Sequence, residues 1–392
     1  YWRWGGLTVE EATAIAIFAI ALLFASFADA VSATFNAYEK MEFPAGLASA
    51  IALGKVALGA LVILPPLEWG FVGLAGVALL MNIVQAAWLY GLLRQKLFIP
   101  RPEMDRSLQR EMLGLSFPLM INHLLATIFW RIDIWILKPL SGAAAVGIYS
   151  AGLKWLDGLN VIPSYFTLAI FPLMSRFAHD SRESLVRAYR LALRLLLMVA
   201  LPTVVFVLFT AEPLIDILGG AEYLPDSAIA LRLLILSIPI GFVNSVTQYV
   251  LIAVNQQRFL TKAFVIGVVF NTVANLIFIP RYGYRAAAVI LIPSELSLLI
   301  PFYWCVRRHV APIPWLDILW RPAAAAAVMA AVMWGLHSRS LPLAVLLGCL
   351  AYALALLLLG TFRHADFDVL RQAMTLEKLR ARWVGLRSGS GW

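Results

Sequence analysis

The sequence predicts an all-α, polytopic integral membrane protein with about eleven transmembrane helices. Of its 392 residues, 62% are hydrophobic and only 14% are charged, with a mean hydropathy of +0.84. This composition excludes an ordinary soluble domain and a disordered chain. A hydrocarbon core about 30 Å thick requires about 20 apolar residues of helix, and runs of that length recur along the whole chain. The loops between them are short, so we expect the function to reside within the membrane.

Each expected span is an apolar run between polar or charged segments. Three spans precede the basic segment from Arg94 to Arg110, two lie between it and the basic segment from Arg176 to Arg194, and six follow. The hydropathy pattern places them at 12–36, 44–64, 70–90, 109–136, 146–174, 194–211, 227–253, 262–280, 284–304, 322–337 and 341–361.

Lysine and arginine are distributed unevenly between the two sides of the membrane. Loops that follow the odd-numbered spans hold 22 of the 31 Lys and Arg residues, and the opposite side holds 5. Because cytoplasmic loops retain positive charge, we expect the N-terminus outside and the C-terminus inside. The acidic outer loop 211–227 agrees with this orientation. The net charge of +9 therefore marks membrane topology, and we expect no nucleic-acid partner.

Eight ionisable residues lie inside the expected spans: the bases Lys55, Arg131, Lys154 and Arg232, and the acids Asp29, Asp133, Asp157 and Glu295. A charge that faces lipid costs at least several kcal/mol, so each should face an interior or a watery cavity. Lys154 and Asp157 are three residues apart on one helix face and could neutralise each other, while Asp133 could pair with Arg131 or Lys154. Structural ion pairs are one interpretation of single residues, and for the whole set we favour a polar cavity.

Several spans contain proline, which removes a backbone hydrogen bond and bends a helix. We interpret Pro118, Pro163, Pro239 and Pro293 as candidate hinges for alternating access, with harmless packing of bent helices as the other interpretation. The sequence has no nucleotide, nucleophile or metal-ligand motif, and the two cysteines lack ligand spacing. We expect no catalytic residue, metal or resident cofactor, and we give little weight to the Asp-Phe-Asp triplet at 366–368.

Two groups of motifs resemble one transporter family. The first group reads LSFPL at 115–119, RIDIWIL at 131–137 and VGIYSAGLK at 146–154. The second reads NTVANLIFIPRYG at 271–283, AAA at 286–288 and SE at 294–295. Together they resemble the second lobe of oligosaccharide-lipid flippases of the polysaccharide transporter family. That family belongs to the superfamily that also holds multidrug extruders and the peptidoglycan-precursor flippase. The resemblance covers about residues 110–300 well and the rest only in general terms.

The resemblance implies fourteen helices, in two six-helix lobes and a terminal pair, around a central cavity. It divides this chain into the remainder of a first lobe (1–100), a second six-helix lobe (101–310), a terminal helix pair (311–365) and a basic cytoplasmic tail (366–392). Three N-terminal helices of the first lobe are then missing, and together with the start at Tyr1 this leads us to expect a longer protein.

The resemblance further implies a flippase of the bacterial inner membrane that moves a polyprenyl-diphosphate-linked glycan for cell-surface polysaccharide biosynthesis. The four bases would line the substrate cavity, and the four acids would couple transport to H⁺ or Na⁺ or balance charge. Membrane lipids and glycan-assembly enzymes are the other expected partners. A multidrug extruder, a membrane-embedded polymerase or glycosyltransferase, and a transport-silent scaffold are the alternatives.

Overall fold

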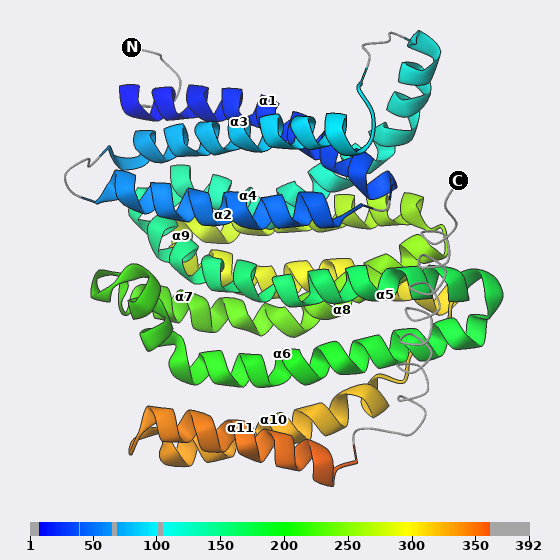
Figure 1. Ribbon diagram of the computed structural model, residues 1–392. Coiled ribbons are helices and arrows are strands. Elements are labelled where there is room, and N and C mark those ends of the chain that lie inside the picture. Colours follow the sequence, from blue (N-terminus) through cyan, green and yellow to red (C-terminus); the bar gives the residue numbers. More distant parts are fainter. Residues whose placement is uncertain (1–7, 39, 65–68, 101–104, 361–392) are drawn as a thin grey trace. The chain divides into compact units, whose positions relative to one another are not determined.

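The computed structural model describes residues 8–38, 40–64, 69–100 and 105–360, with Leu115, Pro118 and Leu119 described by their backbone only. All regular structure in these ranges is helical (Figure 1). The basic tail at 366–392 and its Asp-Phe-Asp triplet lie outside the described residues. The chain divides into two compact units, Tyr1–Gln109 and Arg110–Trp392.

The first unit consists of three long helices, α1 (Val9–Ala37), α2 (Glu42–Ile63) and α3 (Gly70–Lys96). The Thr8 side chain accepts a hydrogen bond from the backbone N–H of Glu11, whose carboxylate accepts one from the Thr8 backbone; this capping box starts α1. Both α1 and α2 pack against α3. Phe35 and Leu89 are completely buried at the centre of this unit, while many other apolar side chains remain exposed, as expected of helices that face lipid.

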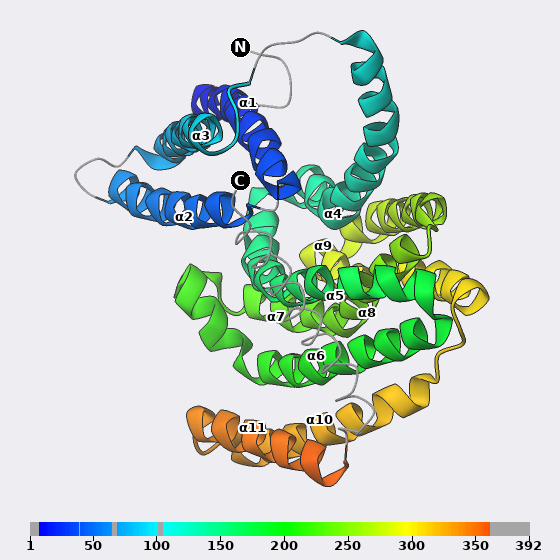
Figure 2. The same ribbon diagram turned by 45° about the vertical axis from the view of Figure 1, so that its right-hand side comes forward.

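The second unit contains the remaining helices, beginning in the first turns of α4. They are α4 (Arg106–Leu159), α5 (Val161–Asp180), α6 (Arg182–Gly219), α7 (Asp226–Leu234), α8 (Ile238–Ala253), α9 (Gln257–His309), α10 (Trp315–His337) and α11 (Leu341–Leu358). Short 3-10 turns at Ala221–Tyr223 and Ile235–Ser237 precede α7 and α8. The helices of this unit run alongside one another (Figure 2).

Two glycines fold α4 and α9 back on themselves. Gly142 (φ 82°, ψ 173°) and Gly283 (φ 56°, ψ −138°) adopt backbone conformations that residues with a Cβ rarely reach. The halves of α4 lie side by side, since the Tyr149 hydroxyl in the second half donates a hydrogen bond to Asp133 in the first. In α9, the rings of Phe264 and Phe302 lie 5.9 Å apart across the same kind of fold.

The predicted multi-pass architecture is confirmed. Within the described ranges, nine continuous helical stretches are long and apolar enough to cross a membrane. Two of these, Met120–Asp180 and Gln257–His309, contain the folds at Gly142 and Gly283, and each supplies two of the eleven spans that the sequence predicts. The two glycines fall in the predicted loops between those spans.

Two of the candidate hinge prolines coincide with helix breaks. Pro163 lacks the N–H that would bond to the carbonyl of Leu159, and α4 ends at Leu159. Pro239 likewise cannot bond to the carbonyl of Ile235, where a 3-10 turn separates α7 from α8. The predicted spans 146–174 and 227–253 therefore each contain a local irregularity within one continuous helical stretch. Pro293 lies within the second half of α9 and Pro118 within the first half of α4, neither at such a break.

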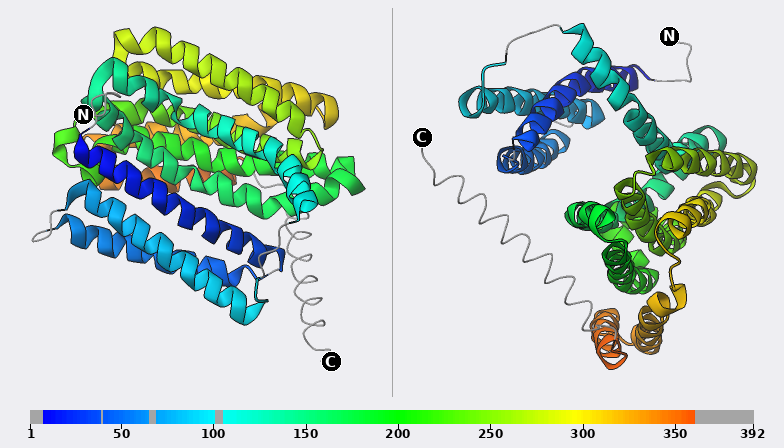
Figure 3. Two further views of the ribbon diagram at one scale, coloured as in Figure 1. Left: turned by 90° about the horizontal axis from the view of Figure 1, so that it is seen from above. Right: turned by 90° about the vertical axis from the view of Figure 1, so that its right-hand side faces the viewer.

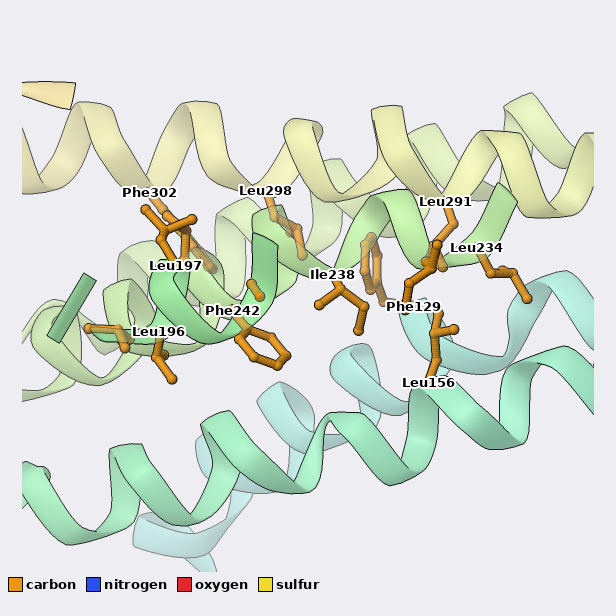
Figure 4. Close-up of a cluster of buried hydrophobic side chains, with 14 of the residues drawn as sticks. Phe129, Leu156, Leu196, Leu197, Leu234, Ile238, Phe242, Leu291, Leu298 and Phe302 are labelled. Carbon is orange, nitrogen blue, oxygen red and sulfur yellow. The ribbon is translucent and has the colours of Figure 1, made fainter. Parts of the chain in front are cut away.

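The core of the second unit surrounds α7 and α8, the most deeply buried of its helices. Figure 4 shows Phe129 and Leu156 from the two halves of α4 and Ile238 and Phe242 around the start of α8, with Leu298 from α9 nearby. The terminal pair α10 and α11 packs on α6, at the edge of the unit (Figure 3).

Candidate substrate cavity

A cavity of about 350 Å³ lies inside the second unit, between the two halves of α4, α5, α8 and α9. Its lining is unusually polar for a site between membrane helices, because it contains a guanidinium, two carboxylates and several amides and hydroxyls. The polar side chains of such helices must face the interior of the protein, because the hydrocarbon of the bilayer offers them no hydrogen bonds. The cavity is therefore the candidate functional site of this unit.

One wall of the cavity holds an ion pair between the two halves of α4. Nη2 of Arg131 lies 3.1 Å from Oδ2 of Asp157, and the two side chains are 43% and 47% exposed. The fold at Gly142 brings these residues together although they are 26 positions apart in the sequence. The pairing of Lys154 with Asp157, one option from the sequence, is wrong: Lys154 is exposed and forms no salt bridge with any described residue. Arg131 reaches Asp157 from the facing helix instead.

Glu295 forms a second, deeper part of the cavity. It is 1% exposed on α9, and the side-chain N–H groups of Asn244 on α8 donate to its Oε2 at 2.6 Å and to its main-chain oxygen at 2.9 Å. Oε1 of Glu295 and Oδ1 of Asn244 are both buried and have no hydrogen-bond partner among the described residues. Gly241 lies beside the carboxylate, and a Cβ built there would meet Oε1 at 3.7 Å.

Several cavity residues were not singled out by the sequence analysis. Trp130, Ser245 and Tyr249 line the cavity. A signal for part of this set exists in the sequence: Gly241, Asn244, Ser245 and Gln248 recur at the spacing that places residues on one face of a helix. A stripe of small and polar residues along an otherwise apolar span marks the face that turns away from lipid.

The remaining predicted site residues lie elsewhere. Lys55 on α2 donates to Oδ1 of Asn82, 2.9 Å away, within the first unit. Asp29 is exposed on α1. Asp133 is buried and accepts the Tyr149 hydroxyl, so neither of its predicted pairings, with Arg131 or with Lys154, is present.

Arg232 lines a different pocket, with residues of α6 and the end of α10, and is not part of the cavity between α4 and α9. Its Nη2 lies 3.1 Å from Oε1 of Glu212, and its Nε donates to the carbonyl of Leu208. Among the described residues, no group of three or more His, Cys, Asp or Glu side chains is arranged to hold a metal ion.

A protein-family model described as polysaccharide biosynthesis protein matches residues 8–228, more than half of the chain. The chain belongs to this family. The match includes the helices of the first unit, so the family signal extends further toward the N-terminus than the motifs at 110–300 indicate. No curated protein matches the sequence of the chain.

The fold is that of known multi-helix transporters. Lipid II flippase MurJ in an inward closed conformation matches with a TM-score of 0.71 at 14% identity, over 90% of this chain and 73% of that one. An inward-facing multidrug resistance transporter of the MATE family and MOP superfamily matches with a TM-score of 0.60 at 16% identity, over 77% of this chain and 72% of that one. A MOP superfamily transporter from Pyrococcus furiosus matches with a TM-score of 0.55 at 15% identity, over 76% of this chain and 75% of that one. At such identities the likeness establishes the fold.

Proposed function

We propose that this protein is a flippase that translocates a lipid-linked oligosaccharide, a polyprenyl-diphosphate-linked glycan unit, across the bacterial inner membrane. The observation that carries the proposal is a polar cavity, with Arg131, Asp157 and Glu295 in its wall, enclosed by membrane-spanning helices of a polysaccharide biosynthesis protein. The many hydroxyls of a glycan lose water hydrogen bonds on entering hydrocarbon, and a polar cavity replaces those bonds. The likeness to MurJ, a lipid II flippase, supports the same assignment.

The protein acts in this proposal as a transporter and carries out no covalent chemistry. The proposed orientation places the C-terminus in the cytoplasm, where the excess of Lys and Arg lies. Glycan-assembly enzymes on the cytoplasmic side would supply the substrate.

Coupling to an ion is part of the proposal, and Glu295 is its candidate residue. The Glu295 carboxylate is 1% exposed, and one of its oxygens bonds to no described residue, which makes it a candidate to take up a proton or Na⁺. Occupation of this site would change the charge of the cavity by one unit. Such a change can favour one conformation of a transporter over another only if the ion binds the two conformations with different affinity.

A second function, extrusion of a small cationic compound, is favoured by one observation. The cavity holds two carboxylates and one guanidinium, and an excess of acids suits a cation. The likeness in fold to an inward-facing multidrug resistance transporter of the MATE family supports keeping this alternative.

The two functions are separated by a transport assay with the purified protein in proteoliposomes. We expect flipping of a fluorescent polyprenyl-diphosphate-linked oligosaccharide, and reduced flipping by Glu295→Gln under a proton or sodium gradient. Uptake of a cationic dye with no flipping of the glycan lipid would overturn the flippase assignment. Equal flipping by wild type and Glu295→Gln under both gradients would remove Glu295 from coupling.

A further inference from the structure

The charge of the cavity between α4 and α9 determines what kind of ligand it suits. Its one guanidinium, on Arg131, is already paired with Asp157 at 3.1 Å, and Glu295 is the third ionisable group of the lining. The three groups sum to zero or to a net negative charge, depending on the protonation of Glu295. A diphosphate brings further negative charge close to these carboxylates, and the described lining residues include no unpaired Lys or Arg to balance it. The cavity is therefore poorly suited to the diphosphate of a glycan lipid.

The accessible hydrogen-bonding groups of the cavity suit a ligand with hydroxyls. The side chains of Ser245 and Gln248 line the cavity and form no hydrogen bond with any described residue, so they are available to a ligand. Each can both donate and accept, as a sugar hydroxyl does, whereas a fully ionised phosphate can only accept. Asn244 and Glu295 bond to each other, and their remaining acceptor atoms have almost no accessible surface.

The shape and the apolar part of the lining agree with a sugar ring. The half-buried rings of Trp130 and Tyr249 lie in the cavity wall, and the face of a sugar that carries C–H groups packs on aromatic rings. The volume of about 350 Å³ is at the low end of the range for small-molecule sites, about 300–1,000 Å³. It suits one small part of a glycan lipid at a time.

We propose that this cavity binds an uncharged sugar of the lipid-linked glycan, whose hydroxyls bond to the Arg131–Asp157 pair, Ser245 and Gln248. The diphosphate then lies outside this cavity. The assignment rests on the proposed flippase function and adds a specificity: a neutral sugar is accepted here, and an acidic sugar is repelled by the carboxylates.

Binding of three defined lipids to the purified full chain in nanodiscs tests this assignment. The probes share one polyprenyl diphosphate and carry no sugar, a glucose, or a glucuronic acid. We expect the glucosyl lipid to bind about tenfold more tightly than the lipid without sugar, as for one hydrogen bond to a charged group, and the glucuronosyl lipid to show no such gain. Arg131→Gln and Gln248→Leu should each abolish the gain and leave binding of the sugar-free lipid unchanged.

Matched controls exclude a general loss of structure. The Arg176–Asp180 ion pair has nearly the same length, 3.2 Å, and lies away from the cavity, so Arg176→Gln should keep the tenfold gain. Ser245→Ala, a smaller change in the cavity, should reduce the gain about threefold without altering the thermal unfolding midpoint.

The outcomes distinguish this assignment from the flippase proposal itself. Arg131→Gln weakening all three lipids equally would place the diphosphate in the cavity, and an equal gain for glucuronic acid would refute the charge argument. Either result overturns the sugar assignment while glycan-lipid flipping in proteoliposomes stays intact. No binding of any of the three lipids, together with no flipping, would overturn both.

Discussion

Replacement of Asn244 by leucine tests the polar network on which the cavity depends. The Asn244 amide is the hydrogen-bond donor to Oε2 of Glu295, at 2.6 Å, and it also donates to the main-chain oxygen of Glu295 at 2.9 Å. Leucine fills a similar volume and removes both bonds. Because Glu295 is 1% exposed, water inside the folded helix bundle has little access to replace the lost donor.

The size of the effect follows from those two bonds. A hydrogen bond to a charged group contributes about 1.5–3 kcal/mol, and a bond to a neutral carbonyl contributes about 1 kcal/mol. Asn244→Leu should therefore lower the free energy of unfolding by about 2–4 kcal/mol. For domains of about 150–250 residues, each kcal/mol moves the unfolding midpoint by about 2–4 °C, so a decrease of about 4–16 °C is expected.

Thermal unfolding of the purified variants in one detergent provides the measurement. Gln248→Leu is the matched control: it makes the same kind of change one helical turn further along α8, at an amide that bonds to no described residue, and should shift the midpoint by less than about 2 °C. The double variant Asn244→Leu with Glu295→Met removes both partners and should recover most of the loss. Equal midpoints for Asn244→Leu and wild type, or no recovery in the double variant, would refute the network.

Three further predictions concern topology and packing. Reporter fusions after Arg182 should report the cytoplasm and fusions at Leu218 the outside, and an outside signal at Arg182 would contradict the predicted orientation. Gly142→Ala should destabilise the second unit by about 1–3 kcal/mol in thermal unfolding, because the φ of 82° at this position strains any residue with a Cβ. An unchanged unfolding midpoint would show that the fold of α4 does not need this conformation. Tyr352→Phe removes the hydroxyl that donates to the Met198 carbonyl at 2.7 Å, so the free energy of unfolding should fall by about 1 kcal/mol and α11 should become more accessible to proteolysis. Unchanged cleavage would mean that apolar packing alone holds α11.

The folds within α4 and α9 illustrate what local sequence can specify. The apolar runs predict spans because transfer of each side chain into hydrocarbon depends mainly on that side chain. Gly142 and Gly283 lie in the predicted loops, where the chain turns through backbone conformations that other residues rarely adopt. Pro163 and Pro239 mark breaks for an equally local reason, the missing N–H.

The sequence by itself determined the membrane class, the approximate spans and the set of charges that need an interior. Only the tertiary structure decided how those charges are paired: Arg131 with Asp157, Arg232 with Glu212, and Lys55 with Asn82. Each of these contacts joins residues 20 or more positions apart, so it depends on the register in which helices pack against one another. Lys154 and Asp157 are only three positions apart on one helix, yet they form no ion pair. The Asp157 carboxylate pairs instead with Arg131, on the facing half of α4. Packing register is set by the whole helix interface, and no local pattern of residues encodes it.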